Sequence, residues 1–156
     1  MIRQIAFCFA LSILSGSCSS LSRFEMPPDL PDQVEFNRDI RPILSNNCSA
    51  CHGPDGGPRK ANLRLDVREV AIGQRQGYDD PAISPGSPRA SALVERILQE
   101  DPQKRMPPPE KDEVGSGGKV LSHREKALLI RWIEQGAKWE PHWAYKPLVR
   151  PVVPSP

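Results

Sequence analysis

Two cysteines three positions apart, followed at once by a histidine, constrain this chain more than any other feature. The motif is Cys48-Ser-Ala-Cys51-His52. A cysteine–x–x–cysteine–histidine run is typical of covalent haem c attachment. Its spacing lets the two thiols form thioethers with the two vinyl groups on one edge of a porphyrin, and it holds the histidine beneath the iron. We therefore predict one haem c per chain, attached through Cys48 and Cys51, with His52 as an iron ligand.

Three other uses of a cysteine pair compete with this interpretation. A redox-active dithiol of the thioredoxin type needs a strand–turn–helix context, which a helix-rich chain lacks. A structural zinc site needs four ligands, and the remaining histidines, His123 and His142, are distant and have no paired spacing. A plain disulfide between Cys48 and Cys51 is the third possibility. The histidine directly after the pair favours haem.

The second axial position of the iron has one outstanding candidate, Met106. It lies in the run Arg105-Met-Pro-Pro108, where the prolines fix φ and stiffen the loop. A thioether in a stiff loop would face the iron with little entropy left to lose, whereas a flexible loop would let water compete. Histidine and methionine are a known axial pair of cytochromes c. We predict His52 and Met106 as the two iron ligands.

Other assignments remain open for this position. Met106 could instead fill a gap in the core, as methionine often does. His123, in the first turn of the last predicted helix, and His142, in the tail, are rival ligands, although both are expected at the surface. Arg105 is a candidate donor to a haem propionate or a solvated side chain. Trp132 is expected in the core, close to the ring or to the first helix.

The first seventeen residues have the order of an export signal. Arg3 precedes a short apolar run over residues 5–14, and small residues then lead to Cys18. This run is too short to span a bilayer as a finished helix and is typical of a signal peptide. We expect Cys8 to be removed with the signal. The protein is then periplasmic or otherwise extracytoplasmic.

The position of Cys18 also resembles a bacterial lipoprotein cleavage site. Such sites usually have leucine three residues before the cysteine, where this chain has Ser15, with Leu14 one place earlier. Ordinary cleavage and lipidation both remain open. A single lipid on Cys18 would associate the protein with a membrane without spanning it.

Four helical segments are predicted between residues 34 and 140. In the first, Asp39 is a candidate N-cap, Pro42 lies in the first turn, and the helix ends before Cys48. The apolar face of this helix consists of Ile40, Ile43 and Leu44. In the second, Asp66 and Glu69 have the form of a capping box, with Gly73 as the stop.

The third predicted helix begins with Ser87 as N-cap and Pro88 at the first helical position. Its apolar stripe consists of Leu93, Val94, Ile97 and Leu98. The fourth begins with a capping box from Ser122 to Glu125 and ends at Gly136. Its buried seam is predicted to be Leu129, Trp132 and Ile133.

The fold class follows from these segments and from the loops between them. Eighteen prolines and eleven glycines in 156 residues predict long loops, and no strand alternation is visible. We predict an all-α, small cytochrome c-like fold of about four short helices and long loops around one covalent haem. Residues 1–17 are the predicted signal peptide, 18–33 a flexible tether, 34–140 the cytochrome c domain, and 141–156 a proline-rich extended tail. The net charge of +2 includes no basic stripe of the kind that binds nucleic acid.

Several separate motifs together resemble the planctomycete-type cytochrome c domain. The first is the run from Val34 to Gly53, and the later ones follow in the family's order: Leu63-Arg-Leu-Asp66, Pro85-Gly-Ser-Pro88, Ser91-Ala-Leu93, Arg96-Ile97, Arg105-Met-Pro-Pro108 and Trp132-Ile-Glu-Gln-Gly-Ala137. The resemblance covers about residues 34–147. It implies a class I-like cytochrome c fold, axial ligands His52 and Met106, and electron transfer outside the cytoplasm.

The resemblance also bears on where the domain ends, and it fails at one loop. In the family, a run like Trp139–Pro147 leads into larger domains, so this chain is either a domain that stands alone or one piece of a longer protein. The departure is at Gln74 and the loop 75–80, where relatives have paired glycines; only the local loop shape is affected.

The expected function is single-electron transfer rather than catalysis. An iron with two protein ligands has no open site, so it changes redox state with little rearrangement. The partners are then redox proteins whose identity the sequence does not give. One alternative is an accessory electron-entry or tethering module of a larger extracytoplasmic enzyme, contacted through the C-terminal tail. Another is a haem-based sensor or peroxidase with an open distal site.

Overall fold

The computed structural model describes residues 20–57, 59–74, 77–78, 80–109 and 120–145, and all regular structure among them is helical. This confirms the all-α prediction. Five α-helices and four short 3₁₀ or π turns follow one another in the order η1 (Ser20–Arg23), η2 (Phe36–Ile40), α1 (Arg41–Asn47), α2 (Ser49–His52), α3 (Arg68–Ile72), η3 (Pro88–Ala90), α4 (Ala92–Leu98), α5 (His123–Glu134) and η4 (Trp143–Tyr145). In the described part of the chain, no helix has the length and apolar character needed to cross a bilayer. The predicted signal peptide lies outside the described residues.

The first predicted helix begins earlier than expected. Its π-helical turn η2 starts at Phe36 and continues directly into α1, which ends at Asn47 as predicted and has Pro42 in its first turn. Asp39 is therefore not the N-cap. It lies within η2, where its carboxylate accepts the Glu35 N–H at 2.8 Å. Asp39 therefore acts as the acidic residue of a capping box does: its side chain accepts the backbone N–H of the residue before the first turn.

The second predicted helix is shorter than expected. Helix α3 starts at Arg68, after Val67, without a side-chain cap. The capping box predicted for Asp66 is wrong, because the Asp66 carboxylate pairs with Arg64 instead. The predicted stop at Gly73 is confirmed.

The third predicted helix is divided into two pieces. Pro88 begins the 3₁₀ turn η3, and α4 begins only at Ala92. Ser87 does not cap with its side chain. The break lies at Ser91, whose buried hydroxyl donates to the Ser87 carbonyl and accepts the Ser84 N–H, both at 2.9 Å. These bonds hold the chain in a bend where a continuous helix was expected.

Helix α5 matches its prediction closely. Ser122 and Glu125 form the reciprocal capping box, with the Ser122 hydroxyl accepting the Glu125 N–H and the Glu125 carboxylate accepting the Ser122 N–H. The helix ends at Glu134 with Gln135 as its C-cap, and Gly136 follows with φ +93°, the left-handed conformation that glycine adopts without steric cost. The predicted seam is buried, as are Ala127 and Ile130.

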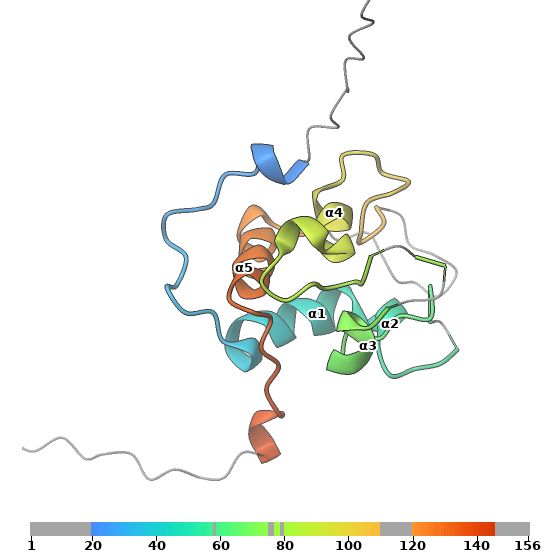
Figure 1. Cartoon of the computed structure of the whole chain (residues 1–156). Helices are drawn as coiled ribbons and strands as arrows, with labels where there is room; N and C mark the ends of the chain where they lie inside the picture. Colours follow the sequence, from blue (N-terminus) through green and yellow to red (C-terminus); the bar gives the residue numbers. More distant parts are fainter. Residues whose placement is uncertain (1–19, 58, 75–76, 79, 110–119, 146–156) are drawn as a thin grey trace, which may run out of the picture.

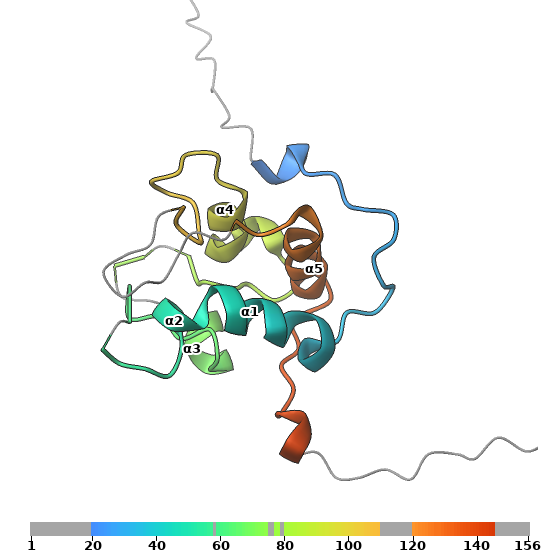
Figure 2. The same cartoon turned by 180° about the vertical axis from the view of Figure 1, so that it is seen from behind.

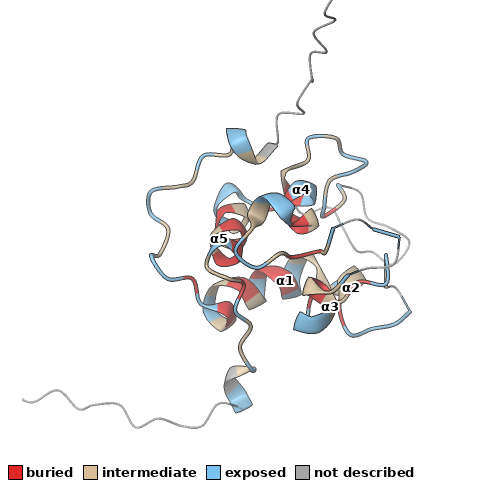
Figure 3. Cartoon of the chain, in the orientation of Figure 1, coloured by how far each residue is buried: buried red, intermediate tan, exposed pale blue. Residues whose placement is uncertain are grey.

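The hydrophobic core forms where α1, α4 and α5 meet (Figures 1 and 2). Figure 3 shows the buried positions on the sides of these helices that face one another. At one end of the core, Phe36, Trp132 and Trp139 form an aromatic cluster, in which the two indole rings are 4.6 Å apart and meet edge to face. The Trp132 indole N–H donates to the Lys138 carbonyl at 3.1 Å. The prediction that Trp132 is a core residue is confirmed.

Residues 20–33, predicted as a flexible tether, run along the folded body (Figure 1). The Phe24 ring packs against the His123 ring at 4.6 Å, and Asp29 pairs with Arg124, both at the start of α5. At the other end of α5, the Gln135 side chain donates to the Asp32 carbonyl at 2.6 Å. This segment therefore contacts both ends of α5.

The start of the predicted tail is also held to the domain. Asn37 donates to the Pro141 carbonyl at 2.8 Å, and Arg41 donates to the Glu140 carbonyl at 2.8 Å. The chain between α5 and η4 is thus held against η2 and α1. Residues 146–156 lie outside the described residues.

Candidate haem site

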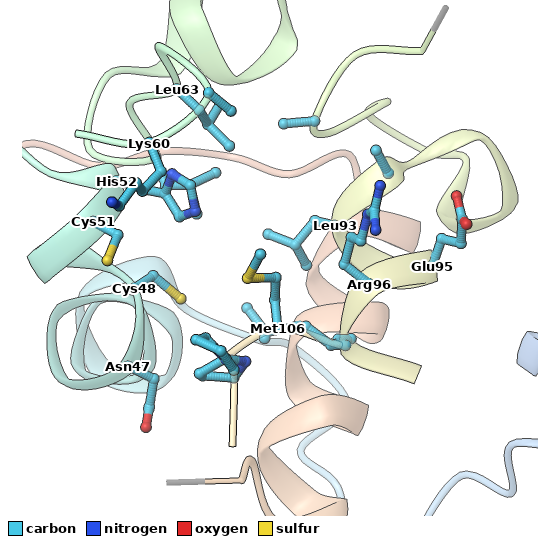
Figure 4. A pocket seen from close by; sticks show the side chains of 18 of the residues that line it. Asn47, Cys48, Cys51, His52, Lys60, Leu63, Leu93, Glu95, Arg96 and Met106 are labelled. Carbon is cyan, nitrogen blue, oxygen red and sulfur yellow. The ribbon is translucent and has the colours of Figure 1, made fainter. Parts of the chain in front are cut away.

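The motif residues lie where one helix ends and the next begins. The Cys48 N–H still donates to the Leu44 carbonyl of α1 at 2.9 Å, and the Cys48 carbonyl accepts the His52 N–H of α2 at 2.8 Å. Backbone hydrogen bonds at the end of α1 and in α2 therefore hold the two thiols and the imidazole close to one another. Figure 4 shows the three side chains grouped on one side of a cavity.

The loop after the motif fixes the position of His52. The His52 carbonyl accepts the Leu65 N–H at 2.8 Å, and the Cys51 carbonyl accepts the Lys60 N–H at 2.9 Å. Gly53 is required at the next position, since any Cβ there would overlap the Ser49 carbonyl oxygen. The backbone can thus turn closely past Ser49 immediately after the histidine.

Met106 comes from a separate loop that is bonded to α4. The Asp101 carbonyl accepts the Lys104 and Arg105 N–H groups, and the Met106 N–H then donates to the Arg96 carbonyl at 3.0 Å. The following Pro107 is buried. The Met106 side chain is 40% exposed, and Figure 4 shows it pointing into the same cavity as His52. Local turns and one bond to a helix therefore place a thioether inside the cavity.

These elements enclose a cavity of about 790 Å³, within the usual range for ligand sites. All four predicted site residues line it, and its walls are otherwise largely apolar: Ala50, Ala61, Leu63, Leu65, Ala82, Ala92, Leu93, Ile97, Pro107, Pro108 and Leu129. The rival ligands His123 and His142 are not among its lining residues. His123 instead packs against Phe24, and His142 against Tyr145.

The residues present fit a covalently attached haem. The cavity offers two thiols, an imidazole and a thioether, and no disulfide joins Cys48 to Cys51. Burial, with smaller contributions from Cys51 and Glu125, raises the pKa of the Cys48 thiol to about 12, so it is protonated at neutral pH. Among the described residues, the Arg105 Nε is buried without a hydrogen-bond partner. Arg105, which the sequence suggested as a donor to a haem propionate, is however not among the residues that line the cavity.

The structure adds charged residues at the cavity that the motif search did not select. Four of them line it: Lys60 in the loop after the motif, Asp80 in the loop after α3, and Glu95 and Arg96 on α4. Arg96 was visible as part of the family motif, and it lies three positions after Leu93, on the same face of the helix. Helical spacing was therefore a usable signal for it, whereas Lys60 lies in a loop without periodicity.

Two comparisons find a relative of much greater length. The chain is 27% identical over 130 residues to hydrazine synthase subunit alpha of Kuenenia stuttgartiensis, a match that covers 69% of this chain and 16% of that protein. A solved structure of Kuenenia stuttgartiensis hydrazine synthase aligns with a TM-score of 0.43 and 24% identity, again over 69% of this chain and 16% of that one. The chain thus spans about a sixth of the length of the relative it matches.

A third comparison finds a match to a family of cytochromes. Residues 48–110 match the family described as planctomycete cytochrome C. The matched segment begins at the first motif cysteine and includes Met106, so it contains all four predicted site residues. Over residues 48–110, the chain therefore matches the family that its sequence motifs resemble.

Proposed function

We propose that this protein is an extracytoplasmic monohaem cytochrome c that carries single electrons through a haem ligated by His52 and Met106. The observation that carries the proposal is that an imidazole and a thioether, from two separate elements, point into one apolar cavity beside two thiols. Haem c, when bound, supplies an iron that alternates between the ferrous and ferric states.

The chain's own residues prepare the site for electron transfer rather than substrate chemistry. His52 is held by the Leu65 N–H bond to its carbonyl, and Met106 by its own N–H bond to the Arg96 carbonyl. If both side chains held a bound haem, they would leave no place for a substrate and would rearrange little when the charge of the metal changes. A methionine ligand together with the histidine would raise the reduction potential of the haem.

The first prediction tests the axial methionine. The purified holoprotein should be six-coordinate and low-spin, with the weak near-red methionine–iron band in its oxidised form. Met106→Leu should abolish that band, lower the reduction potential and allow rapid carbon monoxide binding to the ferrous protein. Met26→Leu is the matched control, because Met26 packs against the core away from the cavity. A five-coordinate, high-spin spectrum of the unmodified protein would contradict the proposal.

A second candidate function is a haem module of a larger extracytoplasmic enzyme. The specific observation in its favour is the match to one sixth of a hydrazine synthase subunit. As a module, this domain would pass electrons to or from a separate catalytic part. Haem-stained native gels of cell extracts distinguish the two functions: a band at the mass of the single chain supports the carrier, and a much larger band that contains this chain supports the module.

The cellular location belongs to the same proposal. We expect export across the cytoplasmic membrane, with the signal removed before Cys18 and either a free or a lipidated N-terminus. Mass spectrometry of the mature protein, produced in a host with haem-attachment machinery, would measure the haem mass, the cleavage site and any lipid together. A polypeptide without added haem mass would contradict the assignment.

A further inference from the structure

Arg96 occupies a distinctive position in the cavity wall. It lies on α4, which is anchored in the core by the buried side chains of Leu93 and Ile97. Figure 4 shows Cys48 and Cys51 on one side of the cavity, Arg96 on the other, and Met106 between them. A guanidinium is therefore held at the wall that faces the two thiols across the cavity.

The guanidinium of Arg96 has capacity for a further acceptor. Its Nη1 donates to the Lys104 carbonyl at 3.3 Å. A guanidinium carries five N–H donors in a rigid fork. None of the ion pairs among the described residues involves Arg96. The neighbouring Glu95 lines the same cavity without forming a described ion pair with it. Most of the donors of Arg96 are thus available at the cavity.

The chemistry of the porphyrin supplies a matching acceptor. Haem carries its two propionate carboxylates on the edge opposite its vinyl groups. If Cys48 and Cys51 held the vinyl edge, the carboxylate edge would be directed toward the wall that contains Arg96. We propose that the Arg96 guanidinium binds a haem propionate, an inference that rests on the proposed function. Arginine suits this task because its fork matches a carboxylate in two parallel hydrogen bonds.

The same residue connects the propionate to the iron ligand. The main-chain carbonyl of Arg96 accepts the Met106 N–H, and its side chain donates to Lys104 two residues earlier. A propionate bound at the guanidinium therefore fixes the segment of α4 that holds the methionine loop. Arg96 is a positioning residue for Met106 as well as a carboxylate ligand.

The test compares three variants of the holoprotein: Arg96→Gln, Arg96→Lys and Lys60→Gln. Lys60 is the matched control, because it also lines the cavity but lies beside His52, on the side of the motif (Figure 4). Arg96→Gln should shift the propionate bending band in the resonance Raman spectrum and lower the reduction potential, since an uncompensated carboxylate stabilises ferric iron. Arg96→Lys should restore most of the potential but only part of the band. Lys60→Gln should leave the band unchanged.

Three results would overturn the inference, and the last is distinguishable from the first two. If haem and the near-red methionine band are present but the propionate band is the same in Arg96→Gln and the unmodified protein, the role of Arg96 is wrong and the electron-carrier function stands. The same holds if Lys60→Gln shifts the band as much as Arg96→Gln. If the unmodified protein carries no haem, the proposed function and the inference fail together.

Discussion

At the scale of single residues, the position of Gly53 requires glycine, although the haem-attachment motif ends at His52 and does not include it. The glycine follows His52, the predicted iron ligand, and a Cβ at this position would overlap the Ser49 carbonyl oxygen. Backbone atoms inside a short helix cannot move aside as a flexible side chain can. The turn after His52 therefore depends on the absence of a side chain.

Gly53→Ala should consequently destabilise the motif. We expect a loss of about 2 kcal/mol in the free energy of unfolding, in the range typical of local strain, together with a lower yield of haem attachment. Urea denaturation and haem absorbance per chain measure the two effects. Gly56→Ala is the control, since a Cβ there meets no atom within 4 Å. Equal stability of both variants would show that the chain relaxes around the added methyl group.

At the scale of elements, α5 is the best-defined helix, and its start is specified locally. Ser122 and Glu125 satisfy each other's backbone groups within four residues of sequence. The start of α4 is different. Ser87 precedes a proline in a favourable pattern, yet the helix begins at Ala92, because Ser91 is buried and bonded to the chain before it.

The two serines therefore respond differently to replacement. Ser122→Ala should lower the free energy of unfolding by about 1 kcal/mol, the usual contribution of an N-cap. Ser87→Ala should change it by a few tenths at most, since the Ser87 side chain makes no capping bond. Urea unfolding curves of the two variants measured side by side provide the comparison. A larger loss for Ser87→Ala would contradict the assigned caps.

At the scale of the whole molecule, the segments before and after the core are both fastened to it. The Phe24–His123 contact and the Arg124–Asp29 pair hold the N-terminal segment to the start of α5. The ion pair is exposed, so it contributes little by itself. The side chains of Leu21, Phe24 and Met26 are partly buried and pack against the core, which attaches the segment further.

Removing that ring should release the segment. Phe24→Ala is expected to lower the free energy of unfolding by about 1 to 2 kcal/mol, less than for a fully buried phenylalanine. It should also speed tryptic cleavage after the exposed Arg23, because the backbone there becomes more accessible. Glu25→Ala, at an exposed position on the same segment, is the control. Unchanged cleavage in Phe24→Ala would mean that residues 20–33 behave as the flexible tether that their composition predicts.

What the sequence by itself determined is local chemistry. The spacing of Cys48, Cys51 and His52 specifies a haem-attachment motif, and the reciprocal cap at Ser122 and the glycine stop at Gly136 depend on neighbours a few residues away. The all-α class follows from such signals, because helical hydrogen bonds form within short stretches of chain. The family motifs also implied Met106 as the second iron ligand.

Only the tertiary structure decided how the separate pieces meet. The Arg64–Asp66 pair displaced a predicted cap, and the packing of Phe24 on α5 overrode a polar, proline-rich composition. The placement of Arg96 opposite the thiols likewise depends on how α4 packs against the core. In each case, a side chain had two alternative sets of partners, either distant in the sequence or among its near neighbours. Burial and contact energies settle such competitions only when the whole chain is folded.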